Sequence, residues 1–189
     1  MKLDPTPSQT VGPYHHYALP YEGGGRLVNS DDPDAVRLIG AIIDGSGQPV
    51  SDALVEIWQA NRAGRYAHPE DQREDLPLDE NFTGFGRVPA DGNGRYEFLT
   101  VKPGLVPGPD GRTPQAPHIQ VTVFARGLLR QLVTRVYFPD EEEANDTDPL
   151  LSSFEDPAAR STLIARQVDD AYGFDIHLQG DRQTVFLDV

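Results

Sequence analysis

Residues 117–124, Pro-His-Ile-Gln-Val-Thr-Val-Phe, are the part of this sequence whose residue types come nearest to a metal site. Side chains alternate across a β-strand, so His118 and Gln120 share one face, while Ile119 and Val121 take the other and are predicted to face the core. A His-x-His pair in this position would present two imidazoles to one metal ion. Gln120 stands where the second imidazole would be, and a neutral amide is a poor ligand for a hard, high-valent ion. The strand therefore indicates half of a metal site.

Further short motifs follow one another along the chain. One is Leu-Val-Glu-Ile-Trp-Gln-Ala-Asn at 54–61, and another is Asp-Gly-Asn-Gly-Arg-Tyr-Glu-Phe at 91–98. The others lie at 64–68, 81–87, 101–104, 116–118 and 134–138. In that order and spacing they resemble the intradiol ring-cleavage dioxygenases, over nearly the whole chain. Transthyretin-like modules share some of these turns, but the segments 65–66, 81–87 and 117–118 distinguish the dioxygenases from them.

The resemblance implies a ferric iron site, which this family builds from two tyrosines and two histidines. Carried over residue by residue, Tyr66 matches the first tyrosine and His118 the first histidine. Leu105 and Val106 stand where the second tyrosine is expected, and Gln120 replaces the second histidine. We interpret Tyr66, Val106, His118 and Gln120 as vestigial metal-site positions, and we expect this chain to bind no metal of its own.

Some members of the family are built from two kinds of chain. Because it lacks two of the four ligands, this chain resembles the iron-free alpha subunit of those members. A homologous beta subunit is then expected to carry the Fe(III) and to assemble with this chain into a higher-order alpha–beta oligomer. The implied reaction is intradiol cleavage of protocatechuate by dioxygen to 3-carboxy-cis,cis-muconate, a step of aromatic compound catabolism in the beta-ketoadipate pathway. The chain would be part of this dioxygenase without supplying a catalytic residue.

Arg126 is the best candidate for contact with a substrate. It follows the strand of His118 in the segment Phe-Ala-Arg-Gly, and its guanidinium can pair with a carboxylate, such as that of protocatechuate, in fork geometry. The resemblance places it beside the partner's active site, together with Thr10, Gly12 and Pro13 of the N-terminal segment. The alternative interpretation is an arginine whose salt bridge fixes the subunit interface.

Strand signals dominate the remaining sequence, and Gly, Pro or Asp residues bound each of them. They predict strands at 36–43, 55–58, 96–99, 119–124, 131–138, 174–178 and 184–187. A helix is predicted from Asp156 as N-cap, with Pro157 at the first helical position, to about Arg166. The acidic segment 140–148 is expected to be a solvated loop. We therefore predict an all-β protein, an antiparallel β-sandwich of transthyretin (prealbumin) type with long loops and one short helix.

Composition narrows the classes of protein that fit. We expect a single intradiol dioxygenase-like domain over residues 1–189, with residues 1–35 as an extended N-terminal arm. The 30 acidic and 16 basic residues give a net charge of −14, which argues against nucleic-acid binding. No apolar stretch is long enough to span a membrane, and the N-terminus does not resemble a signal peptide. With no cysteine, the chain has neither disulfides nor thiolate metal sites. These features favour a cytoplasmic protein.

Other interpretations stay open at this stage. An iron-free transthyretin-like module that binds or scaffolds without a partner would share the strands and turns, and so would a degenerate paralogue without a catalytic role. A homomeric catechol-type enzyme would need all four ligands and, usually, a helical N-terminal domain. Single residues also have plainer interpretations. His118 and Tyr66 could be packed wall residues, the adjacent His15 and His16 should point apart on an extended chain, and His68 and His177 could be structural or surface residues.

Overall fold

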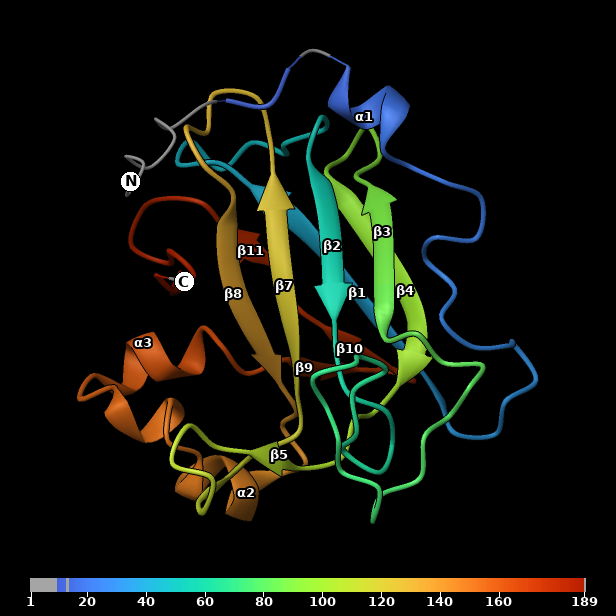
Figure 1. Ribbon diagram of the computed structural model, residues 1–189. Helices are drawn as coiled ribbons and strands as arrows, with labels where there is room; N and C mark the ends of the chain where they lie inside the picture. Colours follow the sequence, from blue (N-terminus) through green and yellow to red (C-terminus); the bar gives the residue numbers. More distant parts are fainter. Residues whose placement is uncertain (1–9, 13, 189) are drawn as a thin grey trace, which may run out of the picture.

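Two β-sheets that face each other form the body of the molecule (Figure 1). The structure is a computed structural model that describes residues 10–12 and 14–188. The first sheet contains β1 (Ala35–Ile43), β4 (Arg95–Val101), β9 (Arg166–Val168), β10 (Ala171–Gly173) and β11 (Ile176–His177). The second contains, in spatial order, β3 (Phe85–Pro89), β2 (Leu54–Trp58), β7 (His118–Phe124) and β8 (Leu132–Tyr137). A separate ribbon pairs β5 (Val106–Pro107) with β6 (Pro114–Gln115).

The predicted all-β class is confirmed, but only the second sheet is antiparallel throughout. Strand β1 pairs antiparallel with β4 and parallel with β10 and β11, so the first sheet is mixed. The strand predicted at 184–187 does not form, because this segment contributes only an isolated bridge between Leu187 and Val133. Strand β3, in contrast, was not predicted. Alternation in the sequence shows which face a side chain takes, whereas the pairing partner depends on where the chain returns in space.

The core lies between the two sheets and takes one face of each strand. Leu38 and Phe98 come from the first sheet, and Ile119, Val121 and Val123 come from β7 in the second. The predicted inward face of β7 is confirmed, because these three β7 residues are fully buried. His118 and Gln120 consequently lie on the outer face of the second sheet.

The helices in the described part of the chain are all short. They are α1 (His15–Ala18), α2 (Glu142–Thr147), the 3₁₀ helix η1 (Leu151–Ser153) and α3 (Pro157–Ser161). Helix α3 begins as predicted, because the Asp156 side chain accepts a hydrogen bond from the backbone N of Ala158. The prediction that it continues to Arg166 was wrong, since Arg166 already belongs to β9. The prediction of a single helix was also wrong, because α1 and η1 form as well and α2 occupies part of the segment predicted as an acidic loop.

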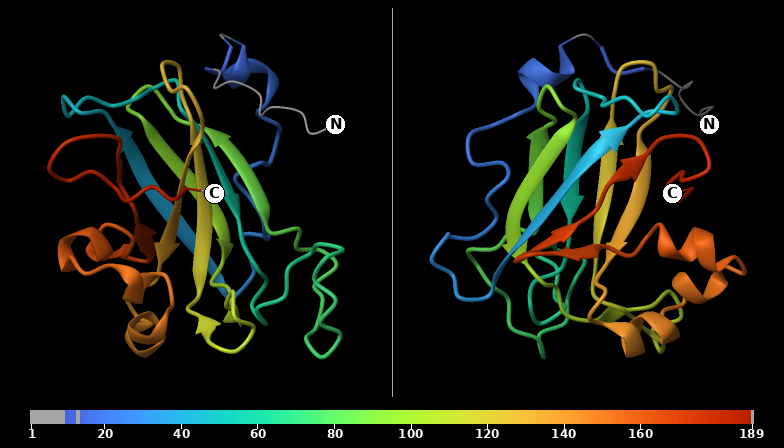
Figure 2. Two further views of the ribbon diagram at one scale, coloured as in Figure 1. Left: turned by 60° about the vertical axis from the view of Figure 1, so that its left-hand side comes forward. Right: turned by 180° about the vertical axis from the view of Figure 1, so that it is seen from behind.

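Connections at the two ends of the sheets carry the candidate functional residues. The long connection between β2 and β3, the short strand β5 and helix α2 all lie at the lower end in Figure 1, and at the upper end α1 lies above the turn that joins β3 and β4. The side and rear views in Figure 2 show the same division. Strand β7 runs from the first end to the second, with His118 at its start and Phe124 at its finish. No helix within the described residues is long and apolar enough to cross a membrane.

Candidate functional site

Strand pairing on the outer face of the second sheet brings chemically active side chains together. Gln120 on β7 lies opposite Trp58 on β2 and opposite Arg135 on β8. His118 lies opposite Tyr137 on β8, with 5.5 Å between the ring centroids. The spacing of His118 and Gln120 in the sequence indicates their common face, but only the pairing of β7 with β8 places Arg135 beside them.

A pocket of about 780 Å³ opens over this row of side chains. Tyr66, Val106, His118 and Gln120, the four residues interpreted from the sequence as vestigial metal-site positions, all line it. They come from the β2–β3 connection, from β5 and from β7, so the fold gathers residues from three separate segments. Trp58, Gln115 and Arg135 also line the pocket, and the sequence analysis assigned none of them to the site.

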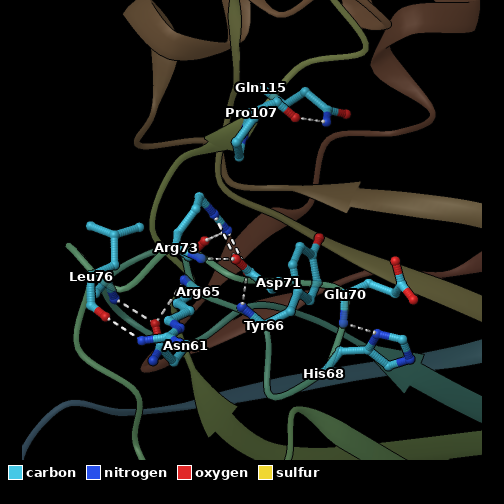
Figure 3. Close-up of polar contacts among 12 residues, drawn as sticks. Asn61, Arg65, Tyr66, His68, Glu70, Asp71, Arg73, Leu76, Pro107 and Gln115 are labelled. Carbon is cyan, nitrogen blue, oxygen red and sulfur yellow. Dashed lines mark hydrogen bonds and ion pairs between the residues drawn. The ribbon is translucent and has the colours of Figure 1, made fainter. Parts of the chain in front are cut away.

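The loop that presents Tyr66 is fixed by its own hydrogen bonds (Figure 3). The carboxamide oxygen of Asn61 accepts from two backbone N–H groups of the turn, including that of Arg65 at 3.0 Å. Gly64 adopts a φ of 82°, and a Cβ atom there would overlap the carbonyl oxygen of Leu105. The turn therefore requires glycine at this position, directly before the Arg-Tyr pair.

An ion pair holds the same loop from its other side. Asp71 Oδ2 accepts from the backbone N of Tyr66 at 2.8 Å, and Arg73 Nη2 donates to the same oxygen at 2.5 Å (Figure 3). The hydrogen bond from Arg73 lowers the pKa of Asp71 to about 2, although partial burial opposes this shift. Asp71 therefore stays ionised at neutral pH. Its negative charge offsets the positive charge of Arg73 at the rim of the pocket.

Aromatic rings form one wall of the pocket. The rings of Tyr66 and Trp58 are stacked, with centroids 5.9 Å apart and planes inclined by 13°. Burial raises the pKa of Tyr66, so its hydroxyl is protonated at neutral pH. Val106, expected from the resemblance to stand in place of the second tyrosine, is 4% exposed and presents only methyl groups.

His118 is buried, at 5% exposed, and its protonation state can be assigned. Its Nδ1 lies 2.7 Å from the carbonyl oxygen of Ala116, which can only accept, so Nδ1 carries a hydrogen. Burial, assisted by the charge of Arg135, lowers the pKa of His118 to about 4. The imidazole is consequently neutral at pH 7, and its Nε2 carries the lone pair.

Arg135 places a cation in the lining of the pocket. Its Nη1 donates to Gln115 Oε1 at 2.6 Å and, over a longer distance of 3.4 Å, to the hydroxyl of Tyr137. Its Nε is buried without a hydrogen-bond partner. The segment 134–138 was part of the family resemblance, but nothing in the sequence showed that this arginine lines the pocket.

These residues do not fit ferric iron. Tyr66 and His118 could each offer one ligand, but Val106 offers none and the amide of Gln120 is a poor one. The positive charge of Arg135 opposes a bound cation in the same pocket. Within the described residues, no group of three or more His, Asp or Glu side chains is arranged to hold a metal ion.

The other predicted residues meet at the opposite end of β7. Arg126 Nε donates to Asp52 Oδ2 at 2.5 Å, and the backbone N of Gly127 donates to Thr10 Oγ1 at 3.3 Å. Burial raises the pKa of Asp52, but the hydrogen bond and charge of Arg126 outweigh it, so the pKa lies below its usual value. Gly12 joins the same cluster, since its carbonyl oxygen lies 3.1 Å from a ring nitrogen of His15. Pro13 lies outside the described residues.

Thr10, Gly12 and Arg126 are remote from the pocket of the same chain. The seven residues of β7 separate His118 from Phe124 by roughly 20 Å, at about 3.3 Å per residue, and Arg126 lies two residues further on. One small ligand therefore cannot contact both ends. His15 and His16 were expected on an extended chain, but they belong to helix α1 at this upper end, where the ring of His15 contacts the carbonyl oxygens of Gly12 and Asp52. His68 lies at the exposed rim of the pocket, and His177 belongs to β11.

Comparisons with known proteins agree with this geometry. A family model described as "Dioxygenase" matches residues 11–180. The alpha chain of protocatechuate 3,4-dioxygenase from Pseudomonas putida is 40% identical, over 98% of this chain and 97% of its own length. The beta chain of protocatechuate 3,4-dioxygenase from Burkholderia cepacia is 42% identical, over 81% of this chain and 68% of its own length. Among solved structures, the dioxygenase domain of a carbohydrate-binding fusion protein from Streptomyces sp. SirexAA-E has a TM-score of 0.60 at 28% identity, covering 96% of this chain and all of that one.

The chain therefore belongs to the intradiol ring-cleavage dioxygenases, a family that uses ferric iron. Within this family it is similar to alpha chains over nearly its full length and to a beta chain over a shorter part. The family predicted from the sequence motifs is confirmed. The similarity to both kinds of chain also supports an alpha–beta hetero-oligomer.

Proposed function

We propose that this chain is the alpha subunit of a heteromeric protocatechuate 3,4-dioxygenase. A homologous beta subunit holds the ferric iron, where the bond between the two hydroxylated ring carbons of protocatechuate is cleaved. Both atoms of dioxygen enter the product, 3-carboxy-cis,cis-muconate. The iron supplies the activation that lets the catechol react with dioxygen. This chain supplies a wall of that site and a permanent subunit interface, but no catalytic residue.

The observation that carries the proposal is the separation of Arg126 from the chain's own pocket. That pocket retains Tyr66 and His118 but lacks donors at Val106 and Gln120 that suit iron. Arg126 lies at the far end of β7, beyond the reach of any ligand in the pocket. An arginine that recognises a substrate from this position must therefore act on a site held by another chain.

The upper end of the sheets is suited to such a contact. The side chain of Arg126 is 66% exposed, and among the described residues only its Nε donates a hydrogen bond, to Asp52, so the two terminal nitrogens remain for a carboxylate. Thr10, Gly12 and Pro13 would complete this substrate-facing surface. Gly12 has open space around its Cα, which lets backbone approach a ligand closely. The similarity to alpha chains over nearly the full length supports this arrangement.

The same proposal includes the finer features of the fold and location. We assign residues 1–189 to one domain of transthyretin-type sandwich architecture, with residues 1–35 as the N-terminal arm that docks on the partner. The two facing sheets with a shared core support this assignment. The net charge of −14 supports a protein without nucleic-acid partners, and we place it in the cytoplasm without a membrane partner.

Co-expression with a cognate beta chain tests the proposal. We expect the purified complex to consume dioxygen with protocatechuate and to contain about one iron per alpha–beta pair, all of it on the beta chain. This chain purified alone should neither consume dioxygen with protocatechuate nor contain iron. Full activity of the beta chain in its absence would contradict a role in the enzyme. A stable homo-oligomer of this chain that does not bind the beta chain would instead favour an iron-free binding or structural module.

A further inference from the structure

The pocket that no longer suits iron has not been filled by side chains. Its volume of about 780 Å³ lies within the range of small-molecule sites, which is about 300–1,000 Å³. Val106 and Gln120 replace ligands, yet the space in front of them stays open. A cavity without a metal can still bind a ligand if its walls offer the right contacts, so the question is which chemistry these walls fit.

The guanidinium of Arg135 is only partly used by the protein. Its Nη1 donates to Gln115 and Tyr137, but within the described residues neither Nε nor Nη2 donates a hydrogen bond, and Nε is buried. The N–H bonds of Nε and Nη2 point to the same side of the planar group, which is an edge that binds a carboxylate in bidentate fashion. A buried donor without a partner costs stability, so a carboxylate at this edge would be bound favourably.

Among the described residues that line the pocket, Arg135 is the cation that no ion pair neutralises. Arg73 is neutralised by Asp71, and the His118 imidazole is neutral. Within the described residues Arg135 forms no ion pair, although the hydroxyl of Tyr137 links it indirectly to the buried Asp148. That carboxylate also accepts hydrogen bonds from three backbone N–H groups, including that of Ala116.

The rest of the lining favours a flat, aromatic ligand. Trp58 and Tyr66 present stacked rings as one wall, and Val106 and Pro107 add apolar surface. Aromatic faces bind planar rings by stacking. Glu70 carries a negative charge at the exposed rim, where solvent screens it from the interior of the pocket.

We infer that this pocket is a metal-free binding site for a small aromatic carboxylate, with Arg135 holding the carboxylate and Trp58 and Tyr66 forming one wall beside the ring. The site is distinct from the proposed contact of Arg126 with the partner's substrate, which lies at the other end of β7. Ligand contact with Nε requires the guanidinium to turn toward the cavity. The half-buried Arg135 side chain permits this movement, because two hydrogen bonds from one nitrogen hold it and one of them is long.

Fluorescence of the full chain offers a direct test, because Trp58 is its only tryptophan and lies in the pocket. We expect benzoate to change this emission saturably in iron-free protein, with calorimetry giving the same affinity. Benzamide has the same shape without the charge and should bind at least about tenfold more weakly, since a charge-assisted hydrogen bond is lost. Equal binding of the two compounds, or no saturable change with benzoate, would overturn the inference.

Substitutions of single residues then test whether Arg135 is the group that binds the carboxylate of the ligand. Arg135→Gln should abolish the preference for benzoate over benzamide, Arg135→Lys should retain part of it, and Arg37→Gln on the other sheet should leave it unchanged. Circular dichroism of each variant checks that it is folded. If Arg135→Gln is unfolded, Trp58→Leu followed by calorimetry decides, because loss of the aromatic ring from this wall should weaken benzoate binding several-fold. Unaltered discrimination in a folded Arg135→Gln protein would show that the carboxylate lies elsewhere.

Discussion

Arg126 and Asp52 form an ion pair across 74 residues of sequence, with Arg126 Nε 2.5 Å from Asp52 Oδ2. Asp52 is the more enclosed partner, since 19% of its side chain is exposed, against 66% for Arg126. The carboxylate therefore orients a largely exposed guanidinium and leaves its terminal nitrogens free. This arrangement suits both recognition of a substrate on a neighbouring chain and a structural role at an interface, and kinetics can separate the two.

Substitution of Arg126 should weaken substrate binding in the assembled enzyme. Arg126→Ala removes a charge-assisted partner of the protocatechuate carboxylate, so KM for protocatechuate should rise roughly ten- to a hundredfold. Catechol has no carboxylate, and its KM should change far less. Steady-state dioxygen uptake with both substrates provides the measurement. Arg130→Ala, in the same connection and also exposed, is the matched control and should leave both values unchanged. Equal weakening of both substrates would assign Arg126 to the interface instead.

The amount of iron that the chain binds should depend on which side chains in its pocket can act as metal ligands. The chain purified alone should bind no stoichiometric iron and lack tyrosinate-to-iron absorption, because Val106 and Gln120 line the pocket where the resemblance predicts two of the four ligands. The double substitution Val106→Tyr with Gln120→His should restore weak binding, limited by the charge of Arg135 and by unadapted surroundings. Metal analysis and visible spectroscopy measure both. About one iron per unmodified chain would be the contrary result.

Acid should destabilise the chain through His118. Its pKa is lowered to about 4, whereas an unfolded histidine titrates near 6.5. Between these values the unfolded chain binds a proton that the folded chain does not, so stability is retained above about pH 6.5 and falls as the pH drops toward 4. At pH 4.5 the loss attributable to His118 is roughly 2 kcal/mol. Urea unfolding at pH 7 and 4.5 should show a smaller decrease for His118→Gln, and an imidazole pKa above 6 by NMR would refute the premise.

The turn that presents Tyr66 should not tolerate a side chain at Gly64. Gly64→Ala places a Cβ against the carbonyl oxygen of Leu105 and forces alanine to a φ of 82°. Backbone strain of this kind costs about 1–3 kcal/mol, and the steric overlap adds to it. Gly92→Ala is the control, because a Cβ there meets nothing within 4 Å. Denaturant unfolding should separate the two variants, and equal stability would show that the loop adapts.

Assembly should depend on the partner chain. Permanent complexes commonly bury more than about 2,000 Å² of surface, and the exposed side chains of Tyr14, Tyr17 and Leu19 near the N-terminal segment offer apolar area for such contact. We expect light scattering of the co-expressed proteins to give a mass well above that of one alpha chain. A monomeric alpha chain beside a folded beta chain would contradict the permanent interface.

The features that the sequence alone determined are local. Alternation along β7 predicted that Ile119 and Val121 face the core while His118 and Gln120 face outward, because side-chain direction in a strand depends only on position parity. The Asp156–Pro157 cap likewise acts on the next few residues. Which ligand types are absent also follows directly from residue identity, at Val106 and Gln120.

The features that only the tertiary structure decided are contacts between distant segments. The place of Arg135 beside His118 and Gln120 required the pairing of β7 with β8, and the parallel pairing of β10 with β1 joined segments more than a hundred residues apart. Asp52 as the partner of Arg126 had no signal in the sequence for the same reason. Such contacts depend on the path that the chain takes between distant segments. Burial of the core as a whole determines this path, and the local preferences of single residues do not encode it.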